Sequence, residues 1–67
     1  MELKCRLKVI FAESNIKHGD FAKKIGISNG ALSAIVNNKS YPSFIVLYKI
    51  TEELNLDIRD IWIKKDL

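Results

Sequence analysis

The sequence predicts an all-α fold, with five short helices in one compact domain spanning residues 1–67. Apolar residues recur three or four positions apart in five segments, and Asn, Gly or Pro separates these segments. No segment of any length alternates with a period of two, as a half-buried strand would. A length of 67 residues, 48% of them hydrophobic, allows one small core. We therefore expect a helical domain without a sheet.

The first helix is predicted over residues 3–14, and Asn15 follows it where a left-handed residue ends a helix. Its apolar residues lie on one side: Leu3, Leu7, Ile10 and Phe11. Cys5 is expected to be a small apolar side chain on this helix. Because it is the only cysteine, no intrachain disulfide forms, which is typical of a reducing compartment.

The second helix is predicted over residues 18–25 and ends at Gly26. Its beginning is weak, because Lys17 is a poor N-cap and Gly19 costs about 1 kcal/mol relative to Ala inside a helix. The side that faces the core contains Phe21, Ala22 and Ile25.

The third helix is predicted over residues 28–37, with Ser28 as its N-cap and Asn38 in a left-handed conformation after it. Its apolar side consists of Leu32, Ile35 and Val36. Its opposite side is small and uncharged, with the residues Asn29, Gly30, Ser33 and Ala34. This is unusual, because the outer side of a surface helix normally carries charged residues.

The fourth helix is predicted to start at Ser43 and to end before Asn55, and Asp57 is the expected cap of a short fifth helix. The inner side of the fourth helix is predicted from the apolar spacing: Phe44, Leu47, Ile50, Thr51 and Leu54. The apolar set of the fifth helix is Ile58, Ile61 and Trp62.

The second and third helices have the spacing of a helix-turn-helix, in which two short helices cross steeply through a three- to four-residue turn. Ala22 leaves room for the third helix, and Gly26 supplies a positive φ at the turn. Inward-facing apolar residues complete the motif: Ile27, Leu32 and Ile35.

The run AKKIGISNGALSAIVNNKSYPSFIVLYKITEELNL resembles the succession A-K-K-[LI]-G-[VI]-S, I-x-N-G-K-x-x-P-S and a Leu-rich fourth helix. This succession is typical of the Cro and phage-repressor class of regulators (XRE-type), which have the lambda-repressor-like fold, and the resemblance covers residues 3–62. It implies sequence-specific binding of double-stranded DNA by a small prokaryotic or phage transcriptional regulator, expected to be a repressor. Many relatives pair an Arg on the first helix with a Glu on the third. The matching positions here are Phe11 and Val36, whose apolar contact can replace the ion pair.

In this class the third helix lies in the major groove and reads base edges. The resemblance therefore assigns base contacts to Asn29, Gly30, Ser33 and Ala34, with Asn29 as the candidate for a bidentate contact to adenine. Contacts to the DNA backbone are expected from the surrounding residues: Lys17, His18, Ser28, Asn37, Lys39, Ser40 and Tyr41. Three alternatives stay open: an outer side without a partner, Lys39 as a solvated residue, and Tyr41 packed against Pro42.

Regulators of this class bind two-fold-related half-sites, so a homodimer is expected. The interface is predicted to use the fifth helix and apolar residues that a small core leaves over: Trp62, Ile63 and Ile45. An equal alternative is that Trp62 caps the core. The alternative function is a protein-interaction module of the same fold, as in an antitoxin or an antirepressor target, with weak DNA binding.

The net charge of +3 is unevenly distributed, since residues 1–49 contain eight Lys or Arg and three acids. This part of the chain can attract a polyanion. One His, one Cys and scattered carboxylates provide no metal cluster and no nucleophile–base pair, so we expect no enzyme, metal, cofactor or small-molecule ligand. The apolar runs are too short to cross a membrane, which predicts a cytoplasmic protein.

Overall fold

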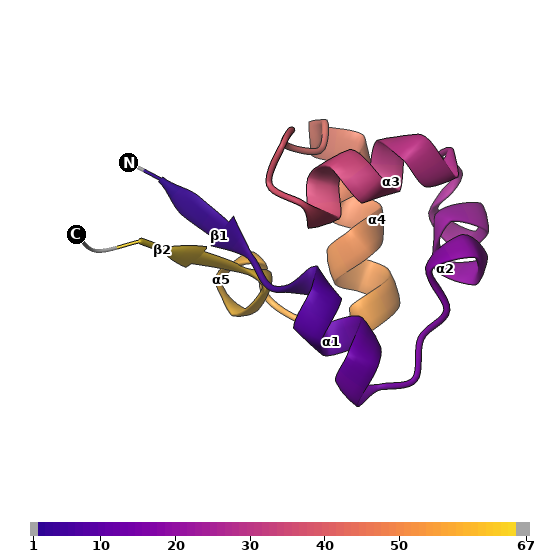
Figure 1. Ribbon diagram of the computed structural model, residues 1–67, viewed down its shortest axis with the longest axis horizontal. Coiled ribbons are helices and arrows are strands. Elements are labelled where there is room, and N and C mark those ends of the chain that lie inside the picture. The colour runs from indigo at the N-terminus through magenta and orange to yellow at the C-terminus, as the bar shows by residue number, and fades with distance from the viewer. Residues whose placement is uncertain (1, 66–67) are drawn as a thin grey trace.

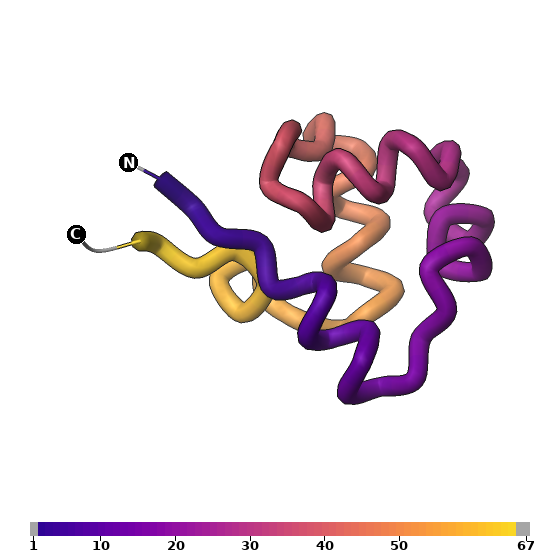
Figure 2. The backbone as a smooth tube through the Cα atoms, viewed as in Figure 1, coloured from indigo at the N-terminus to yellow at the C-terminus, as the bar shows by residue number. Residues whose placement is uncertain are grey.

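The computed structural model describes residues 2–65, which form five helices and a two-stranded sheet (Figure 1). The elements follow one another as β1 (Leu3–Cys5), α1 (Leu7–Glu13), α2 (His18–Ile25), α3 (Asn29–Val36), α4 (Phe44–Leu54), α5 (Ile58–Ile61) and β2 (Trp62–Lys64). The backbone tube in Figure 2 shows the two strands at one end of the molecule and α2 at the other.

Apart from the start of the first helix and the end of the fifth, the predicted helix ends are confirmed, because they depend on local chemistry. Gly26 ends α2 with a φ of 76°. Left-handed Asn residues follow α1, α3 and α4: Asn15, Asn38 and Asn55, with φ values of 55°, 63° and 54°. The hydroxyl of Ser28 caps α3 and that of Ser43 caps α4, each accepting a backbone N–H bond. Asp57 begins α5 in a reciprocal capping box with Asp60.

The prediction of a fold without a sheet is wrong. β1 and β2 pair antiparallel, with Cys5 opposite Trp62 and Leu3 opposite Lys64. Each strand has only three residues, which is too short for an alternating pattern to be recognised. The first helix consequently begins at Leu7, Cys5 lies in a strand, and Trp62 begins β2 instead of continuing the fifth helix.

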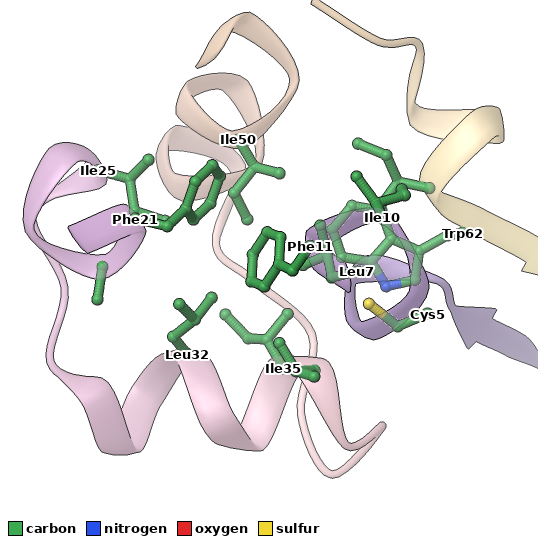
Figure 3. Packing of buried hydrophobic residues seen from close by; sticks show 13 residues of the cluster. Cys5, Leu7, Ile10, Phe11, Phe21, Ile25, Leu32, Ile35, Ile50 and Trp62 are labelled. Carbon is green, nitrogen blue, oxygen red and sulfur yellow. The ribbon is translucent and has the colours of Figure 1, made fainter. Parts of the chain in front are cut away.

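The core lies where α1, α2, α3 and α4 meet, and its most deeply buried side chains are Leu7, Phe21, Ile25, Leu32, Ile50 and Ile61. In Figure 3, Leu32 and Ile35 point from α3 toward Phe11 and Phe21, whose ring centroids are 4.8 Å apart. Phe11 and Val36 are both buried in this cluster, so the positions of the family's ion pair are apolar here. Among residues 2–65 no charged side chain is buried.

The inner side of α4 is smaller than predicted. Of its predicted set only Ile50 is buried, while Leu47, Thr51 and Leu54 are half-buried. Phe44 is 76% exposed, because the small core does not extend to the first turn of this 11-residue helix. Within the described chain, none of the helices combines the length and apolar character that a membrane crossing requires.

Candidate nucleic-acid interface

The small, uncharged side of α3 faces solvent. Asn29, Gly30 and Ser33 are exposed and Ala34 is half-buried, while the opposite side of the helix supplies Leu32, Ile35 and Val36 to the core. α3 contains no charged residue over its eight positions. The surface that it offers is therefore a narrow, polar ridge.

Asn29 lies at the junction of α2 and α3. A Cβ atom built on Gly19, in the first turn of α2, would be 3.7 Å from Oδ1 of Asn29. Gly30, the next residue of α3, has open space around the corresponding position. The first turn of α3 thus presents two features side by side: the amide side chain of Asn29 next to α2, and the backbone of Gly30, which no side chain covers.

Ser33 and Asn37 form one hydrogen-bonded unit on the surface of α3. Nδ2 of Asn37 donates to the carbonyl oxygen of Ser33 at 2.9 Å and to its Oγ at 3.2 Å. Because Oγ accepts this bond, the hydroxyl proton of Ser33 is free to be donated outward. Two predicted contact residues are therefore coupled to each other.

His18, Ser33 and Asn37 come together around one shallow hollow between α1, α2 and α3. The imidazole of His18 is half-buried and meets the ring of Phe11 in a T-shaped contact, with centroids 6.5 Å apart. Lys8 also lines this hollow, and sequence reasoning did not select it. The available signal was its spacing, since Lys8 stands one turn before the inward-facing Phe11.

Basic side chains and free backbone amides surround the ridge. Lys17 precedes α2 in an extended conformation and gives it no side-chain cap, so the first amides of α2 remain available to an anion. Lys39, Ser40 and Tyr41 are exposed in the loop after α3. The two ion pairs within residues 2–65 are Lys24 with Glu53 and Lys65 with Glu2, so neither occupies a basic residue of this surface.

Two predicted residues have structural roles that limit them. The hydroxyl of Ser28 accepts the N–H of Ala31 at 3.1 Å, so it is already used as a cap. Tyr41 is 63% exposed and borders a hollow with Pro42, which agrees with the packing alternative for part of its ring.

The predicted dimer residues differ in accessibility. Trp62 is 6% exposed and packs in the core beside Cys5, which agrees with the alternative that it caps the core (Figure 3). Ile45 and Ile63 are 61% and 40% exposed. In the part of the chain that the structure describes, no three His, Cys, Asp or Glu residues form a metal-binding group.

Comparison with known proteins identifies the class to which this geometry belongs. A family model described as helix-turn-helix (HTH_3) matches residues 7–61. The chain belongs to this helix-turn-helix family. It is also 36% identical over 64 residues to an uncharacterized HTH-type transcriptional regulator, MJ0272, from Methanocaldococcus jannaschii, covering 96% of this chain and 97% of that protein. The resemblance to Cro-like regulators is thereby confirmed, as is the general prediction of a DNA-binding regulator.

The helix-turn-helix match includes every residue predicted to contact DNA, from Lys17 to Tyr41. It begins at Leu7 and ends at Ile61, so β1 and β2 lie outside it. The strands are an addition to the family's matched part of the fold.

Proposed function

We propose that the protein binds double-stranded DNA sequence-specifically as a transcriptional repressor, with α3 inserted in the major groove. The observation that supports this most is the exposed outer side of α3, whose side chains are small, in a helix that carries no charge over its eight residues. A major groove about 12 Å wide accepts a helix whose outer side chains are short or hydrogen-bond to bases. A helix that merely faced water would have no need of this restriction.

Within this proposal the contact residues have distinct roles. Asn29 reads a base edge, Ser33 donates its free hydroxyl proton, and Ala34 contacts a thymine methyl group. Gly30 allows the backbone to approach closely. Residues on both sides of α3 bind the sugar-phosphate backbone and set register and affinity: Lys17, His18, Ser28, Asn37, Lys39, Ser40 and Tyr41. Lys8 joins this set because it borders the hollow that contains His18.

Selection of duplexes from a random pool tests the proposal directly. On the selected duplex, Asn29→Ala should relax preference at one base position at a cost of about 1–3 kcal/mol. Lys39→Ala should weaken binding to all sequences and reduce the salt slope by about 1. Lys24→Ala removes the same charge from the side chain that pairs with Glu53, and serves as the matched control. A pool without enrichment at low salt would refute the proposal.

A homodimer on a two-fold-symmetric operator is the second part of the proposal. Apart from Val9, Ile45, Ile63 and Tyr41 of the proposed DNA-backbone loop, the large apolar side chains that are exposed lie on α4 and α5: Phe44, Tyr48 and Ile58. These three residues line one hollow between α4 and α5.

This surface supplies part of the area that a dimer with a second copy of the chain needs. Phe44 and Tyr48 are 76% and 59% exposed. With roughly 150–250 Å² for each aromatic side chain, they present about 200–340 Å², and a standard interface buries about 800 Å² on each partner, so neighbouring residues must contribute the rest. Phe44→Ser should therefore shift sedimentation equilibrium toward monomer, with Val9→Ser as the exposed apolar control. Sedimentation as a monomer at all concentrations, with and without DNA, would exclude the dimer.

A further inference from the structure

We infer that Asn38 is a positioning residue that ties the proposed DNA-backbone loop, residues 39–41, to strand β1. The inference rests on the proposed function and adds a residue that it does not use. Oδ1 of Asn38 accepts the backbone N–H of Cys5 at 2.7 Å, across 33 positions of sequence. Among the hydrogen bonds of the described chain, this one alone connects residues 37–43 to an element other than α3 or α4.

The backbone of Asn38 places its side chain for this bond. Asn38 follows α3 in a left-handed conformation, with a φ of 63°. Its N–H donates to the carbonyl of Ile35 at 3.2 Å, and the N–H of Lys39 donates to that of Ala34 at 2.8 Å. This pair of bonds is a Schellman motif, in which the left-handed position is usually Gly. An Asn here keeps the helix end and adds an acceptor that Gly lacks.

The acceptor meets an edge of β1 that has no other hydrogen-bond partner among residues 2–65. In an antiparallel pair of strands, hydrogen-bonded and non-hydrogen-bonded residue pairs alternate. The backbone N–H of Arg6 donates to Ile61 and that of Lys65 to Glu2, so these are hydrogen-bonded pairs. Cys5 and Trp62 therefore form a non-hydrogen-bonded pair, and the backbone N–H of Cys5 points away from β2. Cys5 itself is 5% exposed. A buried N–H without a partner is unfavourable, so Asn38 stabilises β1 while β1 holds Asn38.

The bond also connects a part of the chain inside the family match with a part outside it. Both strands lie outside the helix-turn-helix match, while Asn38 and the loop that it begins lie inside it. Within the described part of the chain, the N–H groups of Lys39 and Ser40 donate only to the carbonyl of Ala34 at the end of α3. The tether to β1 therefore gives the loop a second fixed point, which sets the position of Lys39, Ser40 and Tyr41 relative to the ridge of α3.

Asn38→Gly removes the tether and retains the left-handed helix end. Asn55→Gly is the matched control, because Asn55 is also left-handed after a helix, with a φ of 54°. Its side chain makes no hydrogen bond to another element that the structure describes. Both variants are compared with wild type for amide exchange at Cys5, thermal stability, and DNA affinity as a function of salt.

We expect Asn38→Gly to speed amide exchange at Cys5 roughly 5- to 10-fold. Binding should weaken roughly 3- to 10-fold for all sequences, with a salt slope lower by about 1, which is the scale of one lost phosphate contact. Asn55→Gly should change neither the affinity nor the slope. A purely structural role of Asn38 would lower stability and leave the salt slope intact.

The outcomes separate this inference from the function on which it rests. Wild-type protein that binds no duplex refutes the proposed function, and the positioning role with it. Wild-type protein that binds, together with an Asn38→Gly variant of equal affinity and slope, refutes the positioning role alone. An unchanged rate of amide exchange at Cys5 in Asn38→Gly refutes the tether itself. An equal loss of DNA affinity in Asn55→Gly also refutes the positioning role, because the loss would then follow from removing Asn at any helix end.

Discussion

Replacing Gly30 by Ala separates the stability of α3 from its proposed fit in the major groove. Gly30 is the second residue of α3, and Gly19 is the second residue of α2. A Cβ atom at Gly30 has no heavy atom within 4 Å, and one at Gly19 makes an ordinary contact at 3.7 Å with Asn29. Both positions have space for Ala, and neither has a positive φ.

Both Gly→Ala variants should therefore be more stable than wild type. The preference of a helix for Ala over Gly is about 0.5–1 kcal/mol, which raises the melting temperature by roughly 2–8 °C in a domain of this size. Their DNA affinities should differ. The methyl group at Gly30 projects from the exposed ridge, so overpacking against base edges should cost about 1–3 kcal/mol, or roughly 5- to 150-fold in affinity.

Thermal and urea unfolding, together with fluorescence anisotropy on a selected duplex, measure both effects. Gly19→Ala controls for the added stability, because it adds the same methyl group to α2 and not to the exposed ridge of α3, so it should lose less affinity than Gly30→Ala. A Gly30→Ala protein that is more stable and binds equally well would refute close approach of this backbone to DNA. A Gly30→Ala protein that is less stable than wild type would contradict the finding that Gly30 has open space around it.

Three further predictions concern the fold. Gly26→Ala should lower the free energy of unfolding by about 1–2 kcal/mol, because the φ of Gly26 is 76°; urea unfolding measures it. Asp57→Ala should cost about 0.5–2 kcal/mol, measured in the same way, because it opens the capping box of α5. Burial raises the pKa of the Cys5 thiol, an effect that a backbone hydrogen bond with Leu7 partly offsets. The unfolded chain therefore loses this proton first, so stability should be constant below the unfolded thiol pKa of about 8.5 and fall as pH rises through the higher folded-state pKa. Iodoacetamide should correspondingly alkylate native protein more slowly than unfolded protein.

Sequence reasoning predicted the helix ends because their causes are local. A left-handed φ at Asn15, Asn38 and Asn55 and the hydroxyl caps at Ser28 and Ser43 each depend on a few neighbouring residues. The sheet was missed because its hydrogen bonds join distant residues. Arg6, for example, donates to Ile61 at 2.7 Å, and nothing within three residues of either position indicates this pairing.

The candidate site was likewise predictable where it depends on local sequence and not where it depends on tertiary packing. The 3.6-residue period was enough to place Asn29, Gly30 and Ser33 on the exposed side of α3. Lys8 was not found, because its position beside His18 depends on how α1 packs against α2 and α3. The tether from Asn38 to Cys5 is equally invisible in the sequence, since it requires the unpredicted strand.

The pairing of β1 with β2 has a practical outcome for engineering. The backbone nitrogen of Lys65 is 2.9 Å from the carbonyl oxygen of Glu2, and the two strands lie at the end of the molecule opposite α2 (Figure 2). A fluorescent reporter or an added domain joined before Glu2 or after Lys65 would therefore start from the same end of the molecule. A short peptide joining the two ends would close the backbone into a ring, and new termini between α1 and α2 would give a circular permutant.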